Sequence, residues 1–146
     1  MHDLVSEHRE LGGVTLSKDL ARHMSKRLAK GKVAIITDRP LPLLSSVRKQ
    51  WIKLIRLAQR ERSSTLNHSR QNEITQEILR LQNATFSIER PIDDPIADIC
   101  LATIEQSLLA PPVCRTLYVT CNIQRYELHM VTSWMPQGGL VVIYGE

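Results

Sequence analysis

The feature that most constrains the fold is a series of short apolar runs separated by longer amphipathic segments. Val33-Ala34-Ile35-Ile36 is the first run, and similar runs fall within residues 115–121 and 140–144. An apolar run of about four to eight residues, rich in β-branched side chains, is typical of a strand buried on both faces. Such strands alternating with helices predict βαβ units and a mostly parallel sheet.

The expected elements follow from this alternation. We expect strands over residues 32–38, 85–89, 98–103, 115–121 and 140–144, and helices over residues 43–62, 68–83, 104–109 and 122–134. A further helix begins at Thr15 or Ser17, with Ser17 as its N-cap, and stops at Gly31. The two prolines at 40 and 42 are expected to keep residues 39–42 out of regular structure.

These elements predict a small Rossmann-like α/β domain with an open, mostly parallel sheet of four or five strands and flanking helices. Helices 43–62 and 68–83 come after the first strand and predict a helical hairpin or one long bent helix. The order of a helix, Gly31-Lys32 and a strand ending in Thr37-Asp38 resembles the architecture of a lobe of RecA-like helicases. The resemblance covers this segment alone and carries over no functional residue.

Length and composition predict one domain over residues 1–146, with residues 1–14 as a mobile arm or a short helical turn. The polar start has the features of neither a signal peptide nor a transit peptide. No apolar run approaches the length of a membrane span, which is about 20 residues. Cys100, Cys114 and Cys121 lack the number and spacing of a disulfide framework or a zinc site. We therefore expect a cytoplasmic protein without membrane contact, bound metal or cofactor.

Charge is distributed unevenly along the chain, which has a net charge of +4. Residues 1–84 contain 16 Lys and Arg against 8 Asp and Glu, whereas residues 85–146 contain 3 against 7. Such asymmetry favours a polyanionic partner or charge-guided self-association. A homo-oligomer in which the basic half meets the acidic half is one form of the second alternative.

Two helices each carry a row of cations opposite their apolar side. The first basic strip consists of Lys18, Arg22, Lys26 and Lys30. The second basic strip consists of Lys49, Lys53, Arg56 and Arg60, which fall within about 60° of one another on an ideal helix. Like charges one turn apart repel, and a solvated face usually mixes both signs. The strips therefore favour a binding role over an ordinary solvated surface.

The kind of polyanion is less sharply specified. Single strands are usually held by stacking on aromatic side chains, and Trp51, Phe86 and Tyr118 lie on apolar faces or in strands rather than among the cations. Phosphates of a duplex or an acidic protein surface fit better. Base-edge contacts by Arg48, Gln50, Gln59 and Arg62 are the weaker part of this prediction.

Small-molecule sites receive less support. The chain contains neither a GxGxxG nor a GxxxxGK[ST] motif. The ends of the expected strands offer Asp38, Arg39 and Cys121, and carboxyl ends of parallel strands are where ligands bind in open α/β sheets. Cys121 is expected just before a helix, a position that favours a thiolate, although a buried structural cysteine is the commoner case.

Metal binding is not favoured by the remaining polar residues. His2, His8, His23, His68 and His129 are scattered without ligand spacing. The acidic segment with Glu89, Asp93, Asp94 and Asp98 is bounded by prolines and is more typical of a solvated loop.

Three hypotheses remain open. The first, a non-enzymatic nucleic-acid-associated module that contacts phosphate through the basic strips, is preferred. The second is an adaptor or complex subunit that docks an acidic protein surface through the same strips. The third is a small enzyme with a cleft around Asp38, Arg39 and Cys121.

Overall fold

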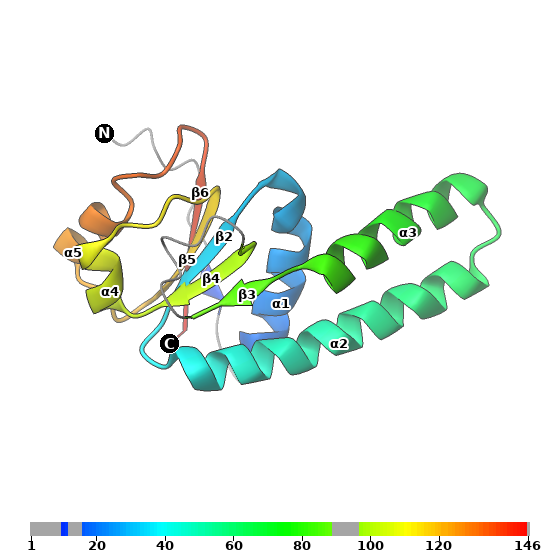
Figure 1. Cartoon of the computed structure of the whole chain (residues 1–146), viewed down its shortest axis with the longest axis horizontal. Coiled ribbons are helices and arrows are strands. Elements are labelled where there is room, and N and C mark those ends of the chain that lie inside the picture. The colour runs from blue at the N-terminus through cyan, green and yellow to red at the C-terminus, as the bar shows by residue number, and fades with distance from the viewer. Residues whose placement is uncertain (1–9, 12–15, 89–96, 146) are drawn as a thin grey trace.

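A computed structural model of the chain describes residues 10–11, 16–88 and 97–145. The helices are α1 (Leu16–Arg27), α2 (Pro40–Ser64), α3 (His68–Asn83), α4 (Ile104–Leu109) and α5 (Arg125–Val131), with a short 3₁₀ turn η1 (Leu28–Lys30) after α1. The strands are β1 (Glu10–Leu11), β2 (Val33–Ile36), β3 (Phe86–Ser87), β4 (Ile99–Ala102), β5 (Thr116–Thr120) and β6 (Leu140–Tyr144). Figure 1 shows the sheet with helices on both of its faces.

The strands form one sheet in the order β1-β6-β5-β2-β4-β3, and every pair of neighbours is parallel. Four strands have four or five residues, and the two outermost strands, β1 and β3, have two each. The predicted fold class, a small Rossmann-like α/β domain with a parallel sheet, is confirmed.

Alternate residues of each central strand pack into two separate cores. In β2, Val33 and Ile35 pack beneath α1 and α2, whereas Ala34 and Ile36 pack beneath α4 and α5. All residues of β2, β4 and β5 are buried, as the unbroken apolar runs predict. We call α1, α2 and α3 the basic layer, and α4 and α5 the opposite layer.

The helical hairpin after β2 is confirmed, and it extends well beyond the sheet (Figure 1). The 25 residues of α2 span about 37 Å at 1.5 Å per residue. Near the sheet, Leu44, Val47 and Trp51 pack into the core of the basic layer. Farther along, Ala58 of α2 packs against Ile74 and Ile78 of α3, so the distal hairpin has its own small apolar contact.

The prediction that two prolines keep residues 39–42 out of regular structure is wrong. α2 begins at Pro40, and both Pro40 and Pro42 lie in its first turn. The first N–H groups of a helix have no intrahelical acceptor, so proline costs little there, and its fixed φ suits the helix. The Leu43 N–H already donates to the Arg39 carbonyl, at 3.2 Å.

Other boundaries also differ from expectation. Ser17 is the second residue of α1 rather than its cap, and Asp19 lies in the first turn. The expected helix over 122–134 is only Arg125–Val131, and the expected strand over 85–89 is only Phe86–Ser87. Within the expected amino-terminal arm, Glu10–Leu11 form β1 against β6, and the rest of that arm lies outside the described residues.

Among the described residues, the structure contains no helix with the length and apolar character needed to cross a membrane.

Candidate functional site

Both basic strips lie on the outer side of the basic layer. The eight side chains are all solvent-exposed. Leu20 and Met24 of α1 and Val47 and Trp51 of α2 are buried in the same core, on one face of the sheet. α1 and α2 also pack against each other. The sides opposite these buried residues therefore face away from the sheet within one layer.

The second basic strip lies in the middle of α2, where the helix dipole gives no reason for cations. Favourable dipole interactions are confined to the last turn of a helix, and in α2 the basic residue of that turn is Arg62. In α1, Lys26 lies in the last turn and so has a structural explanation. Lys18 lies near the helix start, where a positive charge is disfavoured.

The first basic strip is less regular than predicted. α1 ends at Arg27, and Lys30 belongs to the 3₁₀ turn Leu28–Lys30 rather than to the same α-helix. A 3₁₀ turn winds more tightly than an α-helix, so Lys30 is displaced from the row of Lys18, Arg22 and Lys26. The second basic strip is therefore the more regular surface.

Other basic residues near these helices have structural partners. The Arg27 Nε donates a hydrogen bond of 2.9 Å to Thr116 Oγ1, and the Arg48 guanidinium lies 5.6 Å from the centre of the Phe86 ring. Arg70 is paired with two glutamates. By contrast, no ion pair within residues 16–88 and 97–145 involves a member of either strip.

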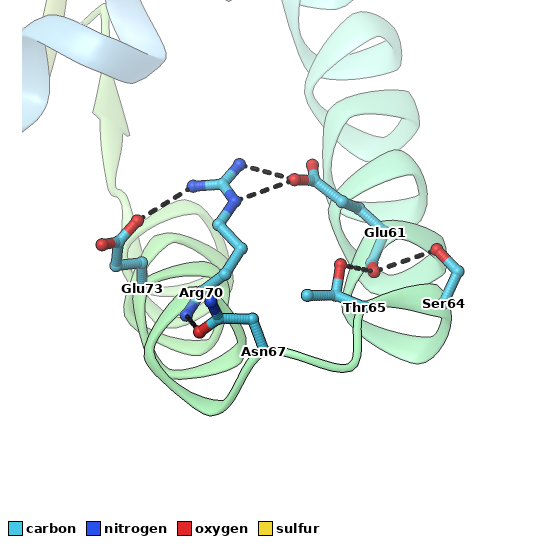
Figure 2. Close-up of polar contacts among 6 residues, drawn as sticks. All are labelled: Glu61, Ser64, Thr65, Asn67, Arg70 and Glu73. Carbon is cyan, nitrogen blue, oxygen red and sulfur yellow. Dashed lines mark hydrogen bonds and ion pairs between the residues drawn. The ribbon is translucent and has the colours of Figure 1, made fainter.

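The pairing of Arg70 also explains why Glu61 leaves the second strip unneutralised. Arg70 donates to Glu61 Oε1 through Nε, at 3.0 Å, and to Glu73 Oε2 through Nη1, at 3.1 Å (Figure 2). These hydrogen bonds, that to Glu61 first, raise the pKa of Arg70 above its usual value. The Glu61 carboxylate therefore points across the hairpin toward α3 and away from the cations on the outer side of α2.

The same network orders the tip of the hairpin. Ser64 Oγ and Thr65 Oγ1 both donate to the Glu61 carbonyl, and the Asn67 side chain caps α3 by accepting from the Arg70 N–H (Figure 2). These contacts hold α2 and α3 in one arrangement at the turn. The predicted start of the second helix at residue 68 is confirmed.

A hollow of about 360 Å³ lies on the distal part of the second basic strip, lined by Arg56, Gln59, Arg60 and Ser63. Two guanidinium groups one turn apart, with the Gln59 amide beside them, supply several hydrogen-bond donors to an anion such as phosphate, whereas Ser63 Oγ donates to the Gln59 carbonyl at 3.0 Å. Of the four residues considered for base edges, only Gln59 lies in this hollow. Arg48 faces Phe86, and Gln50 and Arg62 are half-buried.

The strand-end residues come together only in part. Asp38 follows β2 and Asn122 follows β5, and Asn122 Nδ2 donates to Asp38 Oδ2 at 3.1 Å. Cys121 Sγ is 4.0 Å from Asn122 Oδ1 and is half-buried. Arg39 is exposed at the start of α2, where its N–H donates to Thr37 Oγ1 at 3.3 Å. β2 leads to α2 on one face and β5 leads to α5 on the other, which makes this a switch point in the topology.

Cys121 is not placed at a helix start as expected. α5 begins at Arg125, and Gln124 and Glu127 form a capping box there, in which Glu127 Oε1 accepts from the Gln124 N–H at 2.8 Å. Cys121 lies in the turn that precedes this cap. The first turn of α2 is also poorly suited to hold a phosphate, because Pro40 and Pro42 have no N–H to donate.

No metal-ligand cluster occurs in the part of the chain that the structure describes: no three His, Cys, Asp or Glu side chains gather there. His2, His8, Glu89, Asp93 and Asp94 lie outside the described residues. Asp98 has a structural role, because its carboxylate accepts from the Thr85 N–H and Oγ1 at 3.0 and 3.1 Å.

The sequence analysis missed an exposed apolar surface on the opposite layer. Tyr126 and Met130 of α5 and Trp134 in the turn after it are spaced four residues apart, and Tyr126 and Trp134 are 64% and 63% exposed. Leu109 and Val113, at and after the end of α4, are exposed as well. The four-residue spacing was the available signal, but spacing alone does not reveal whether such a stripe faces core or solvent.

Comparison of the chain with family models, with curated proteins and with solved structures gives no match in any of the three.

Proposed function

We propose that this chain is a non-enzymatic, nucleic-acid-associated module whose basic layer contacts the phosphates of a duplex. The observation that carries the proposal is the set of eight exposed cations on the outer side of α1 and its following turn and of α2, without an ion pair among the described residues. Unpaired cations on one surface attract a polyanion and release its counterions on binding.

A duplex suits this surface better than a single strand. Trp51 is buried, and Phe86 is half-buried beside the Arg48 guanidinium, so neither ring is offered for stacking next to the second basic strip. The exposed rings of Tyr126 and Trp134 belong to the opposite layer, across the sheet. Backbone contact without stacking is the mode that fits a row of cations on a helix.

The hollow between Arg56 and Arg60 is the best candidate for a single phosphate. A guanidinium donates two parallel hydrogen bonds to a phosphate, and the Gln59 amide adds an uncharged donor. Lys49 and Lys53 lie two and one turns nearer the start of the helix and would contact neighbouring phosphates as point charges.

Binding to fluorescently labelled nucleic acid tests the proposal. We expect the protein to bind duplex DNA or duplex RNA at low salt, and Lys53→Gln/Arg60→Gln to weaken binding by roughly tenfold. Arg39→Gln/Arg115→Gln removes the same charge from exposed positions outside the strips and should change binding much less. If the two double variants weaken binding equally, the effect depends on net charge alone, which would contradict the assignment of nucleic-acid binding to the strips.

The same titration separates an acidic protein partner from nucleic acid. If the protein binds polyglutamate in preference to every duplex, the protein is instead an adaptor that docks acidic proteins.

We place the module in the cytoplasm, since none of its three cysteines forms a disulfide.

A second candidate function, a small enzyme, is supported by the hydrogen bond between Asp38 and Asn122 at the switch point of the sheet. Its test is the alkylation rate of Cys121, followed by peptide mass spectrometry in the folded protein. An alkylation rate well above that of glutathione at neutral pH would support a nucleophilic role. A rate at or below that of glutathione would remove the cysteine from this candidate.

A further inference from the structure

The opposite layer presents both halves of a complementary contact on neighbouring helices. An open hollow of about 640 Å³ on α5 is lined by Gln124, Arg125, Tyr126, His129 and Met130. Beside it, α4 presents Leu109, which is 89% exposed, and the exposed Glu105 four residues earlier on the same side of that helix. An exposed leucine with a carboxylate matches an apolar hollow with the Arg125 guanidinium at its edge.

The two helices lie in a register that allows these halves to meet across a two-fold axis. Both α4 and α5 return the chain from the carboxyl edge of a parallel sheet, so they run in the same direction, and they pack against each other. Glu105 is the second residue of α4 and Arg125 the first of α5, whereas Leu109 and Met130 are each the sixth. An axis parallel to the helices therefore pairs the first turn of α4, with Glu105, with the first turn of α5, with Arg125, and it pairs the last turns, with Leu109 and Met130.

The composition of this surface is that of an interface. Tyrosine, methionine and arginine are enriched at the centres of protein contacts, and Tyr126, Met130 and Arg125 line this hollow together. The Glu127 carboxylate is held in the cap of α5, and Glu127 is two residues from Arg125, so it lies on a different side of the helix and does not face Arg125. The charge opposite Arg125 can come from Glu105 of another copy.

From this self-complementarity we infer that the surface of α4 and α5 is an interface between two copies of this chain. In the dimer, Leu109 of each copy enters the hollow of the other beside Met130, and Glu105 pairs with Arg125. A contact that contains both halves on one surface closes after two copies and does not propagate. The two basic layers then lie on the outer sides of the dimer, because each is across its sheet from the interface.

Sedimentation velocity over a range of protein concentrations, without nucleic acid, tests this inference. We expect a monomer–dimer equilibrium, with the dissociation constant raised about tenfold or more by Leu109→Asp. Leu66→Asp is the matched control, since Leu66 is 94% exposed at the hairpin tip and lies outside the interface. Circular dichroism of both variants establishes that each is folded.

A charge exchange tests the orientation of the two copies. Arg125→Glu and Glu105→Arg should each weaken the dimer several-fold, and the double variant should restore most of the native affinity. A native protein that stays monomeric at high concentration, or a dimer unaffected by Leu109→Asp, would overturn the inference. The proposed function is tested separately, because monomeric Leu109→Asp retains both basic strips and should still bind duplex.

Discussion

The basic layer and the opposite layer cover the same sheet in different ways. In the basic layer, α2 and α3 have 25 and 16 residues and extend past the sheet, whereas α4 and α5 have only 6 and 7. The long helices bury one apolar side and expose cations, and the short ones leave Tyr126, Met130 and Trp134 in solvent. Covering the sheet requires only short helices, so the length and charge of the hairpin need another explanation. We propose that the hairpin is long and basic because it contacts a polyanion.

The two tryptophans give the largest expected contrast between the layers. Trp51 is 4% exposed in the core of the basic layer, its Nε1 donates to the Leu81 carbonyl at 2.8 Å, and its ring meets Phe86 edge to face. We expect Trp51→Ala to lower the free energy of unfolding by about 3–5 kcal/mol. Trp134→Ala in the opposite layer should change it by about 0.5 kcal/mol or less. Urea unfolding followed by far-ultraviolet circular dichroism measures both, and similar destabilisation by the two variants would contradict the assignment of Trp134 to the surface.

Raising the pH should lower the free energy of unfolding through buried groups in both cores, which is the second-largest expected effect. Burial raises the pKa of Cys114, beneath the opposite layer, to about 12. Burial also raises the pKa of Tyr118 and of Tyr144, beneath the basic layer, far above the usual value. In the unfolded chain the pKa of the thiol is about 8.5 and that of each phenol is about 10, so the unfolded state loses these protons first. Stability is therefore complete below these values and falls as pH rises through them, by up to about 1.4 kcal/mol per pH unit for each group.

Two variants separate the contributions of the two cores to this fall in the free energy of unfolding. Cys114→Ala should reduce the part of the decline that begins at about pH 8.5, and Tyr144→Phe should reduce the steeper part above about pH 10. Each variant is compared with its own stability at neutral pH, because Tyr144→Phe also removes the hydrogen bond from the Tyr144 hydroxyl to the Ile36 carbonyl. A free energy of unfolding that stays constant to about pH 11 would contradict the burial of these groups.

The smallest effect concerns the helix caps of the two layers. The distal hairpin relies on the contact of Ala58 with Ile74 and Ile78, so we expect it to unfold locally while the sheet stays folded. Asn67→Ala should cost about 1 kcal/mol and speed amide exchange in the distal hairpin about fivefold. Thr103→Ala removes the cap of α4 and should leave hairpin exchange unchanged. Hydrogen exchange that rises equally in both layers would mean that the hairpin opens only with the whole protein.

The strands and the long helices could be predicted because each depends on a strong local pattern. β2 and β6 are unbroken apolar runs, and β5 is a short apolar run between two threonines. α3 has the predicted bounds because Asn67 supplies a cap and Ile74, Ile78 and Leu81 repeat at helical spacing. The closeness of Asp38 to Asn122 follows from the meeting of parallel strand ends at one edge. That both basic strips lie on the outer side of one layer required the order of the strands, which no local pattern contains.

Other features depended on choices that a pattern leaves open. Proline is tolerated in the first turn of a helix and excluded from its interior, and Pro40 and Pro42 fit either a loop or the start of α2. The capping box of α5 begins with Gln124 instead of the usual serine or threonine, so the start of that helix was placed too early. The exposure of Tyr126 and Trp134 depends on which side of a seven-residue helix meets the sheet.

The salt dependence of duplex binding tests the central claim most directly. The native chain is compared with Lys49→Gln/Lys53→Gln/Arg56→Gln/Arg60→Gln in fluorescence anisotropy titrations across a salt series. If the second basic strip follows the phosphate backbone, the slope of log affinity against log salt concentration should become shallower by up to about 3.6, or about 0.9 for each phosphate that the variant no longer neutralises. An unchanged slope in the variant, or no binding of any duplex by the native chain at low salt, would contradict the assignment of nucleic-acid binding to the basic layer.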